Sequence, residues 1–168
     1  MEQLPLFDAG PARAGGDAGF FLSALTLWVP WTWAILGLPP ELAKRLENRP
    51  WKPPRKILGR WICLHASAAR KPRYEAAVAA RIREVTGRDV PDLAGLARGA
   101  IVGLAKVSGY VETSDDPWFM GPAVDGKKNY GWLLEAVRPL AQPVPCRGYQ
   151  RLWGVPSGVA AEVVARCG

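Results

Sequence analysis

The sequence predicts an α+β fold: a small mixed β-barrel of about five or six strands with appended helices. Three observations predict it. Strand-like and helix-like segments follow one another along 168 residues without the regular βαβ order of a parallel sheet. Glycine (18) and proline (16) are frequent but not repetitive, which is typical of short elements joined by turns. Apolar (49%) and charged (22%) residues have globular proportions, which excludes a disordered acidic or basic chain.

The first elements are separated by glycine and proline. Residues 1–19 are rich in Gly, Ala and Pro and are expected to be a mobile tail, so that residues 20–168 form a single domain. Residues 20–27 are strand-like. Residues 30–36 are predicted as a short helix, since a proline suits its first turn and a glycine follows it. Residues 45–51 can be extended before a proline-rich run interrupts regular structure.

The middle of the chain has the clearest periodicities. Residues 60–66 alternate between two faces, with Trp, Cys and His on one of them, which predicts a strand. Residues 72–85 are Ala-rich with apolar residues at helical spacing and a closing glycine, which predicts an amphipathic helix. A helical turn is expected at 92–97 and a strand at 99–107.

The last third combines a long loop with further strands. Residues 112–128 are expected to be a loop, acidic at first, that carries Trp118, Phe119 and Met120 either as a lid over a pocket or as a plug in the core. Residues 130–137 and 150–155 are predicted strands, with Pro143–Cys146 between them. Ser157 is expected to cap a helix that ends near Arg166.

Positive charge is concentrated in one part of the chain. Lys plus Arg (22) exceed Asp plus Glu (15), and residues 41–88 contain thirteen of the basic but four of the acidic residues. This asymmetry predicts a positive face for nucleic acid or a phosphate-bearing ligand, the alternative being a solvated surface that aids solubility. The candidate phosphate-binding residues are Arg45, Lys52, Arg55, Lys56, Arg70, Lys71 and Arg73.

Several classes of protein are disfavoured. The 23 uncharged residues between Asp17 and Glu41 could span a membrane by length, but Pro30 lies at their centre and the tryptophans lie mid-span. We therefore expect no membrane association and a cytoplasmic protein with free thiols. Three cysteines without C-x-x-C spacing and a single histidine, His65, disfavour a zinc site, and no metal or cofactor is predicted.

The segment Lys44–Trp51 has the side chains of a polar site. In an extended chain Glu47, Arg49 and Trp51 share a face, where a carboxylate, a guanidinium and an indole could bind a base and its phosphate. The alternative is a surface ion pair beside a packed tryptophan. His65, two residues before Ser67, could be a general base or a core histidine bonded to backbone.

Six short motifs, in order and spacing, resemble the ASCH domain family, a branch of the PUA-like barrels, over about residues 23–156. They are W-V-P-W (28–31), E-N-R-P-W (47–51), W-I-C-L-H-A-S (61–67), P-W-F-M-G-P (117–122), Y-G-W-L-L-E (130–135) and P-V-P-C-R-G-Y-Q-R-L-W (143–153). The resemblance implies a PUA-like barrel with a cleft beside the first helix, in proteins linked to RNA, DNA or modified nucleosides. The family's K-x-x-E-x-R pattern falls on Lys44, Glu47 and Arg49.

The first hypothesis is thus a nucleic-acid-binding module that reads a flipped, single-stranded or modified base. Its candidate base-binding residues are Trp28, Trp31, Lys44, Glu47, Arg49, Trp51, His65, Ser67 and Trp118. The alternative is a hydrolase acting on a modified nucleoside or on RNA, with Lys44 as base and Glu47 as its catalytic partner. Two departures from the family bear on these readings. Val29 replaces a glutamine found in many relatives, and Glu47 stands where amidohydrolase relatives have threonine.

The tail suggests a separate partner. Q-L-P-L-F (3–7) is similar to the pentapeptide with which bacterial replication and repair proteins dock on the DNA sliding clamp. Leu6 and Phe7 could fill a hydrophobic pocket of the clamp, and Gln3 could anchor the peptide by hydrogen bonds. Leu4 is also assigned to this expected docking peptide. The alternative is a hydrophobic patch without a partner.

Overall fold

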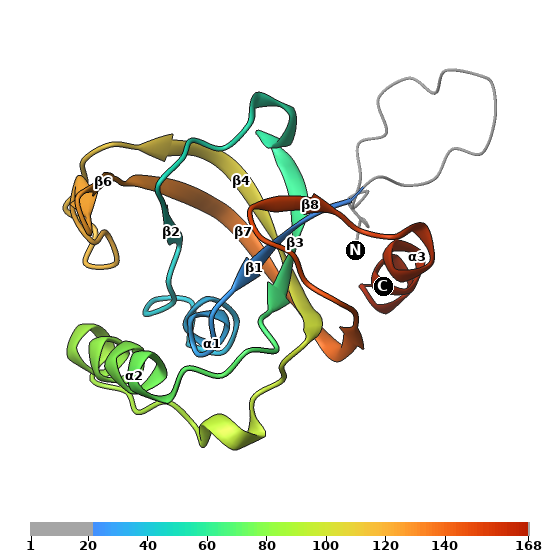
Figure 1. The fold of residues 1–168 in the computed structure, drawn as a ribbon, viewed down its shortest axis with the longest axis horizontal. Coiled ribbons are helices and arrows are strands. Elements are labelled where there is room, and N and C mark those ends of the chain that lie inside the picture. Colours follow the sequence, from blue (N-terminus) through green and yellow to red (C-terminus); the bar gives the residue numbers. More distant parts are fainter. Residues whose placement is uncertain (1–21, 168) are drawn as a thin grey trace.

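Six strands form one mixed sheet that curls into a half-barrel (Figure 1). The computed structural model describes residues 22–167. The strand order is β2-β7-β4-β3-β1-β8, and only the pair β1–β3 is parallel. The strands are β1 (Ser23–Leu27), β2 (Leu46–Arg49), β3 (Arg60–Ala66), β4 (Ala100–Val111), β7 (Tyr130–Pro145) and β8 (Leu152–Gly154).

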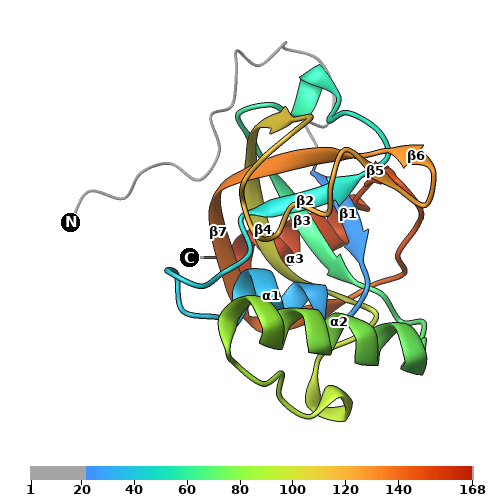
Figure 2. The ribbon, with the colours of Figure 1, turned by 90° about the vertical axis from the view of Figure 1, so that its left-hand side faces the viewer.

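A separate two-stranded ribbon, β5 (Ala123–Val124) and β6 (Lys127–Lys128), projects beside β2. Its turn is Asp125–Gly126, where both residues have positive φ (51° and 73°), as a tight hairpin turn requires. The ribbon lies within the segment 112–128 that the sequence predicts as a loop, and Figure 2 shows it next to β2. It therefore carries its two lysines to the edge of the main sheet.

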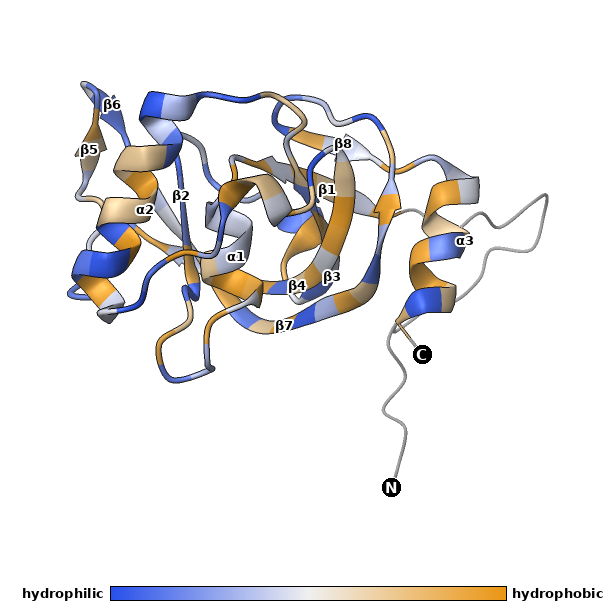
Figure 3. Ribbon diagram, turned by 90° about the horizontal axis from the view of Figure 1, so that it is seen from below, coloured by the Kyte–Doolittle hydropathy of each residue, from blue (hydrophilic) through white to orange (hydrophobic). Residues whose placement is uncertain are grey.

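The helices lie at two sides of the sheet. Helices α1 (Trp31–Leu36) and α2 (Pro72–Thr86) stack at one end, whereas α3 (Ser157–Arg166) packs on the opposite side (Figures 1 and 2). Both longer helices, α2 and α3, alternate hydrophilic and hydrophobic residues, as helices that cover a core do (Figure 3). Two 3₁₀ turns, η1 (Arg55–Ile57) and η2 (Leu93–Gly95), complete the described elements.

The alternation of β3 divides the core. Ile62 and Leu64 pack in a cluster on the concave face with Leu27 and Trp132, while Cys63 packs on the other face with α3. Both faces of the sheet are therefore covered. A third cluster joins α1, α2, β2 and the 112–122 loop through Trp31, Leu46, Val78, Ile82 and Trp118.

The predicted α+β fold class is confirmed, and so are the strand at 60–66 and the helices at 30–36 and 72–85, within a residue or two at their ends. The strand predicted at 130–137 is longer in the structure, where β7 runs from Tyr130 to Pro145. The C-terminal half of β7 pairs with β4 as far as Pro145. Prolines are tolerated there because β2 pairs only with Tyr130–Leu133 on the other side of β7.

Ser157 does not cap the last helix. Pro156 holds the capping position, and no side chain donates or accepts a capping hydrogen bond there, so Ser157 is the first helical residue. The clamp-like peptide (3–7), the tail and the first two residues of the predicted strand 20–27 lie outside the described residues. Within residues 22–167, no helix is both long enough and apolar enough to cross a bilayer.

Helix α1 approaches the sheet at Gly103 of β4. A Cβ there would lie 2.8 Å from the Arg138 carbonyl oxygen and 2.7 Å from a Leu36 methyl. We expect Gly103→Ala to lower the free energy of unfolding by about 1–3 kcal/mol, because the backbone of β7 has to move. Gly109→Ala, in the same strand with nothing within 4 Å of its Cβ, is the matched control in urea denaturation. Equal stability of the two variants would contradict the close approach.

Candidate functional site

A cavity of about 340 Å³ opens between β2, the N-terminal parts of α1 and α2, and the β5–β6 ribbon. Its wall combines aromatic, cationic and amide side chains. The lining residues are Trp28, Trp31, Lys44, Glu47, Asn48, Arg49, Pro50, Tyr74, Met120, Val124, Asp125, Lys127, Lys128 and Asn129. The K-x-x-E-x-R residues of the sequence thus share one concave site.

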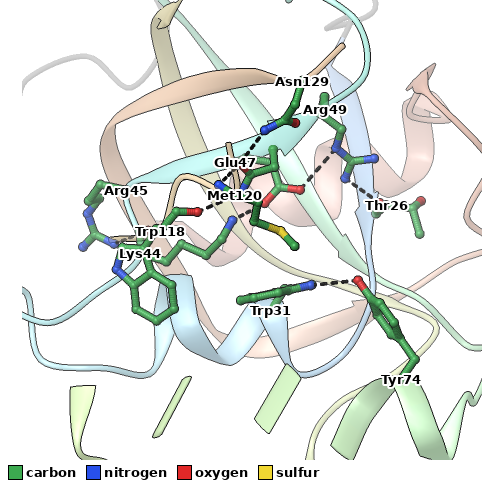
Figure 4. A network of polar contacts seen from close by, with 11 residues as sticks. Thr26, Trp31, Lys44, Arg45, Glu47, Arg49, Tyr74, Trp118, Met120 and Asn129 are labelled. Carbon is green, nitrogen blue, oxygen red and sulfur yellow. Dashed lines mark hydrogen bonds and ion pairs between the residues drawn. The ribbon is translucent and has the colours of Figure 1, made fainter. Parts of the chain in front are cut away.

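Glu47 lies between the two cations, as Figure 4 shows. Its Oε2 accepts a hydrogen bond from Lys44 Nζ, and its Oε1 lies 3.2 Å from Arg49 Nε. The Arg49 Nη2 donates to the Thr26 carbonyl oxygen at 3.0 Å, which attaches β2 to the end of β1. The three charged groups carry a net charge of about +1, so they make the cavity electropositive although both cations contact the Glu47 carboxylate.

Burial determines the protonation chemistry of Lys44. The residue is 1% exposed and Glu47 is 7% exposed. Desolvation lowers the pKa of Lys44 below its ordinary value, and the neighbouring Glu47 carboxylate opposes this by favouring the ammonium form. Removal of the carboxylate would therefore leave a buried cation without its counter-charge.

Aromatic side chains from α1 and α2 make the opposite wall. Trp31 Nε1 donates to the Tyr74 hydroxyl at 3.0 Å, and the Lys44 ammonium lies 5.2 Å from the Trp31 ring centroid. Trp28 meets Tyr74 edge to face at 6.0 Å, and the Lys71 ammonium lies over Trp28 at 4.3 Å. The site therefore offers indole surface beside charged donors and one carboxylate, which suits a flat polar ring.

Asn48 holds the segment that forms the roof. Its side-chain amide donates to the Trp118 carbonyl (2.9 Å), and its oxygen accepts from the Met120 backbone N–H (3.0 Å) and from Asn129 (2.9 Å). Trp118 is 5% exposed, lies edge-on to Trp31, and does not line the cavity. Of the two expectations for Trp118, the structure supports the plug, while half-exposed Met120 lies at the mouth.

His65 and Ser67 lie elsewhere, in a second, more open cavity of about 680 Å³ that shares Trp28 and Arg49 with the first. The His65 ring is 1% exposed; its Nε2 is 2.9 Å from the Cys146 carbonyl oxygen and its Nδ1 is 3.3 Å from Thr26 Oγ1. Burial lowers its pKa, so the ring is held neutral. It has the contacts of a core histidine bonded to backbone.

Trp51 also lies outside both cavities. Strand β2 ends at Arg49, so the alternation that would place Trp51 beside Glu47 stops there. Its ring packs edge-on against Trp132 at 4.7 Å, and its carbonyl accepts from the Trp132 indole. Arg151 covers the face of the Trp51 indole, with its guanidinium group 5.1 Å from the ring centroid.

The fold divides the basic segment 41–88. Lys71 lies over Trp28 at the rim, with Arg70 and Arg73 exposed next to it at the start of α2. Arg55 and Lys56 lie on η1, at the opposite end of the sheet from α2 (Figures 1 and 2). Two further residues of the segment have local partners. Lys52 lies over Tyr110 and Tyr130, and Arg45 turns away to donate to the Ile35 carbonyl (Figure 4).

Sequence reasoning missed four cations that line the cavities. Lys127 and Lys128 face the first, and Arg147 and Arg151 face the second. The signals were present as the Lys-Lys pair after an Asp-Gly turn and as R-G-Y-Q-R at 147–151. Within residues 22–167, no group of three or more His, Cys, Asp or Glu side chains is placed to hold a metal ion.

Comparisons with known proteins add a likeness of shape. The chain is similar to the crystal structure of a ZmASCH mutant protein from Zymomonas mobilis, with 14% identity, a TM-score of 0.46, and coverage of 85% of this chain and 94% of that one. No protein-family model matches the chain. No curated protein sequence matches it either.

The buried ion pair between Lys44 and Glu47 leads to a prediction about the stability of the protein. Glu47→Gln should lower the free energy of unfolding by about 3 kcal/mol at pH 7, because the buried Lys44 side chain loses its counter-charge. Loss of the carboxylate lowers the folded-state pKa of Lys44 further below 10.5, so the unfolded chain binds the proton more strongly. The deficit relative to the wild type should therefore shrink as the pH rises towards 10.5.

Urea denaturation at pH 7, 8.5 and 10 measures this deficit. Glu84→Gln is the matched control, since Glu84 pairs with Arg81 on the exposed surface of α2 and its replacement should change stability little at any pH. A Glu47→Gln deficit that is as large at pH 10 as at pH 7 would contradict the electrostatic origin.

Proposed function

We propose that this protein is a nucleic-acid-binding module that takes one base of a single strand into the first cavity. The observation that carries the proposal is that two indole rings and the Lys44–Glu47–Arg49 group line one cavity of about 340 Å³. Single-stranded nucleic acids are bound by stacking of bases on aromatic side chains and by hydrogen bonds to base edges. The ordered motifs that resemble the ASCH family, linked to RNA, DNA and modified nucleosides, support the same class of ligand.

The charges near the cavity suit a polyanion. Lys127 and Lys128 lie on one side of the mouth, and Lys71 lies on the other, over Trp28. Glu47 is the carboxylate that could accept a hydrogen bond from a base amino group, and Asp125 lies at the ribbon turn. In this proposal the phosphates of the flanking nucleotides follow the rim from α2 to the β5–β6 ribbon, without the distant Arg55 and Lys56.

The same geometry argues less well for the hydrolase alternative. Among the described residues that line the first cavity there is no Ser, Thr, Cys or His to act as a nucleophile, and Lys44 Nζ is bonded to Glu47. Binding is therefore the proposed function, and turnover of RNA or of an acylated nucleoside by the full chain would favour the alternative.

Stacking is tested at Trp28. Trp28→Ala should weaken binding of a labelled single-stranded RNA about tenfold or more in fluorescence anisotropy, because a base–indole contact is worth roughly 1–3 kcal/mol. Trp61→Ala is the matched control, since Trp61 is also half-buried but lies on the α3 side of the sheet. The cavity is not the base site if the two variants lose the same affinity while their circular dichroism stays that of the wild type.

The proposed phosphate contacts at the rim of the first cavity are tested by the salt dependence of RNA affinity. With three to six phosphate contacts, the log–log slope of affinity against salt for single-stranded RNA should be about −2 to −4. Lys127→Ala/Lys128→Ala should make that slope less steep by about 1. Arg83→Ala/Arg88→Ala, a matched loss of two exposed charges at and just beyond the C-terminal end of α2, should leave the slope unchanged. Affinity that is independent of salt would rule out the proposed phosphate path.

A further inference from the structure

The second cavity differs from the first in its charge. Arg49, Arg147 and Arg151 line it, and none of its lining residues is Asp or Glu. Within residues 22–167, Arg147 and Arg151 form no ion pair; their guanidinium groups lie 5.2 Å and 5.1 Å from the ring centroids of Tyr149 and Trp51. Cations that no carboxylate neutralises, gathered in a concave space, attract an anion.

The loop that carries these two arginines is fixed to the sheet. The Cys146 carbonyl oxygen accepts a hydrogen bond from the buried His65 Nε2 at 2.9 Å. Gly148 lies directly against that ring, where a Cβ would come within 2.4 Å of His65 and 2.9 Å of Thr26 Oγ1. The Trp153 indole donates to the same Thr26 hydroxyl at 3.0 Å. The buried histidine thus positions the loop, and the arginines start from a preorganised backbone.

Arg151 has a backbone conformation that fits this account. Its φ is +60°, in the left-handed region that residues other than glycine seldom adopt. Such conformations persist where the surrounding contacts impose them, and they are frequent at ligand sites. In this protein Arg151 directly precedes β8, and its guanidinium group lies over the Trp51 ring.

Arg49 joins the two cavities. Its Nε faces Glu47 in the first, and its Nη2 donates to the carbonyl of Thr26, a residue that lines the second. Trp28 also lines both. A ligand that fills both cavities therefore has a flat polar ring at Glu47 and an anionic group on the far side of Arg49, which is the arrangement of a nucleotide.

We propose that the second cavity is a phosphate subsite, so that the ligand of this protein is a nucleotide whose base occupies the first cavity and whose phosphate is bound by Arg147 and Arg151. This inference rests on the proposed function, since it assigns the base to the first cavity. It adds the chemical class of ligand, a phosphorylated nucleoside or the equivalent unit of a strand, and a role for the R-G-Y-Q-R loop.

Isothermal titration of the full chain with three kinds of probe tests the subsite. The probes are the four common nucleosides, their 5′-monophosphates and inorganic phosphate. We expect at least one monophosphate to bind about tenfold or more tightly than its nucleoside, because guanidinium–phosphate hydrogen bonds are charge-assisted. In Arg147→Ala/Arg151→Ala this advantage should fall to about threefold or less, with the affinity for the nucleoside unchanged. Arg83→Ala/Arg88→Ala, the matched control, should keep the full advantage.

The outcomes separate this inference from the proposed function. If the wild type binds single-stranded RNA and nucleosides, but the monophosphate gains nothing or the double variant keeps the gain, the subsite is overturned and the proposed function stands. Inorganic phosphate that binds as tightly as the monophosphate also overturns it, because the base would then contribute nothing. If neither RNA nor nucleosides bind, the proposed function fails, and the nucleotide assignment fails with it.

Discussion

The buried pair between Lys44 and Glu47 is the interaction on which the site depends. An ammonium group that is 1% exposed has lost its hydration, and a carboxylate at hydrogen-bond distance is the group that compensates the loss. Glu47 is held by β2, which is itself held by four residue pairs with β7. Arg49 shares the carboxylate and bonds to the end of β1, so the ion pair also fixes how an edge strand meets the middle of the sheet.

The cavity exists because several short elements are anchored around that pair. Helix α1 brings Trp31, helix α2 brings Tyr74, and a hydrogen bond joins the two. Helix α2 is fixed in turn by the buried Glu75 carboxylate, which pairs with Arg98 at 2.6 Å. Asn48, between Glu47 and Arg49, ties the roof segment to β2. Each wall of the cavity therefore depends on contacts between distant parts of the sequence.

The two cavities have complementary chemistry. The first has indole rings, one carboxylate and paired cations, so it can select a flat ring by stacking and hydrogen bonding. The second has three arginines and no carboxylate, so it favours negative charge without selecting a base. Arg49 and Trp28 line both cavities.

Local pattern determined the strand 60–66, the helix 72–86 and the meeting of Glu47 with Arg49, because strand and helix periods are properties of neighbouring residues. Only the tertiary structure decided which aromatic and basic side chains face the cavities. Trp51 packs on Trp132, Trp118 closes the core, and the rim cations include Lys127 and Arg147 from outside the basic segment. Those positions depend on the curl of the sheet and on contacts between residues far apart in the chain, which no local periodicity encodes.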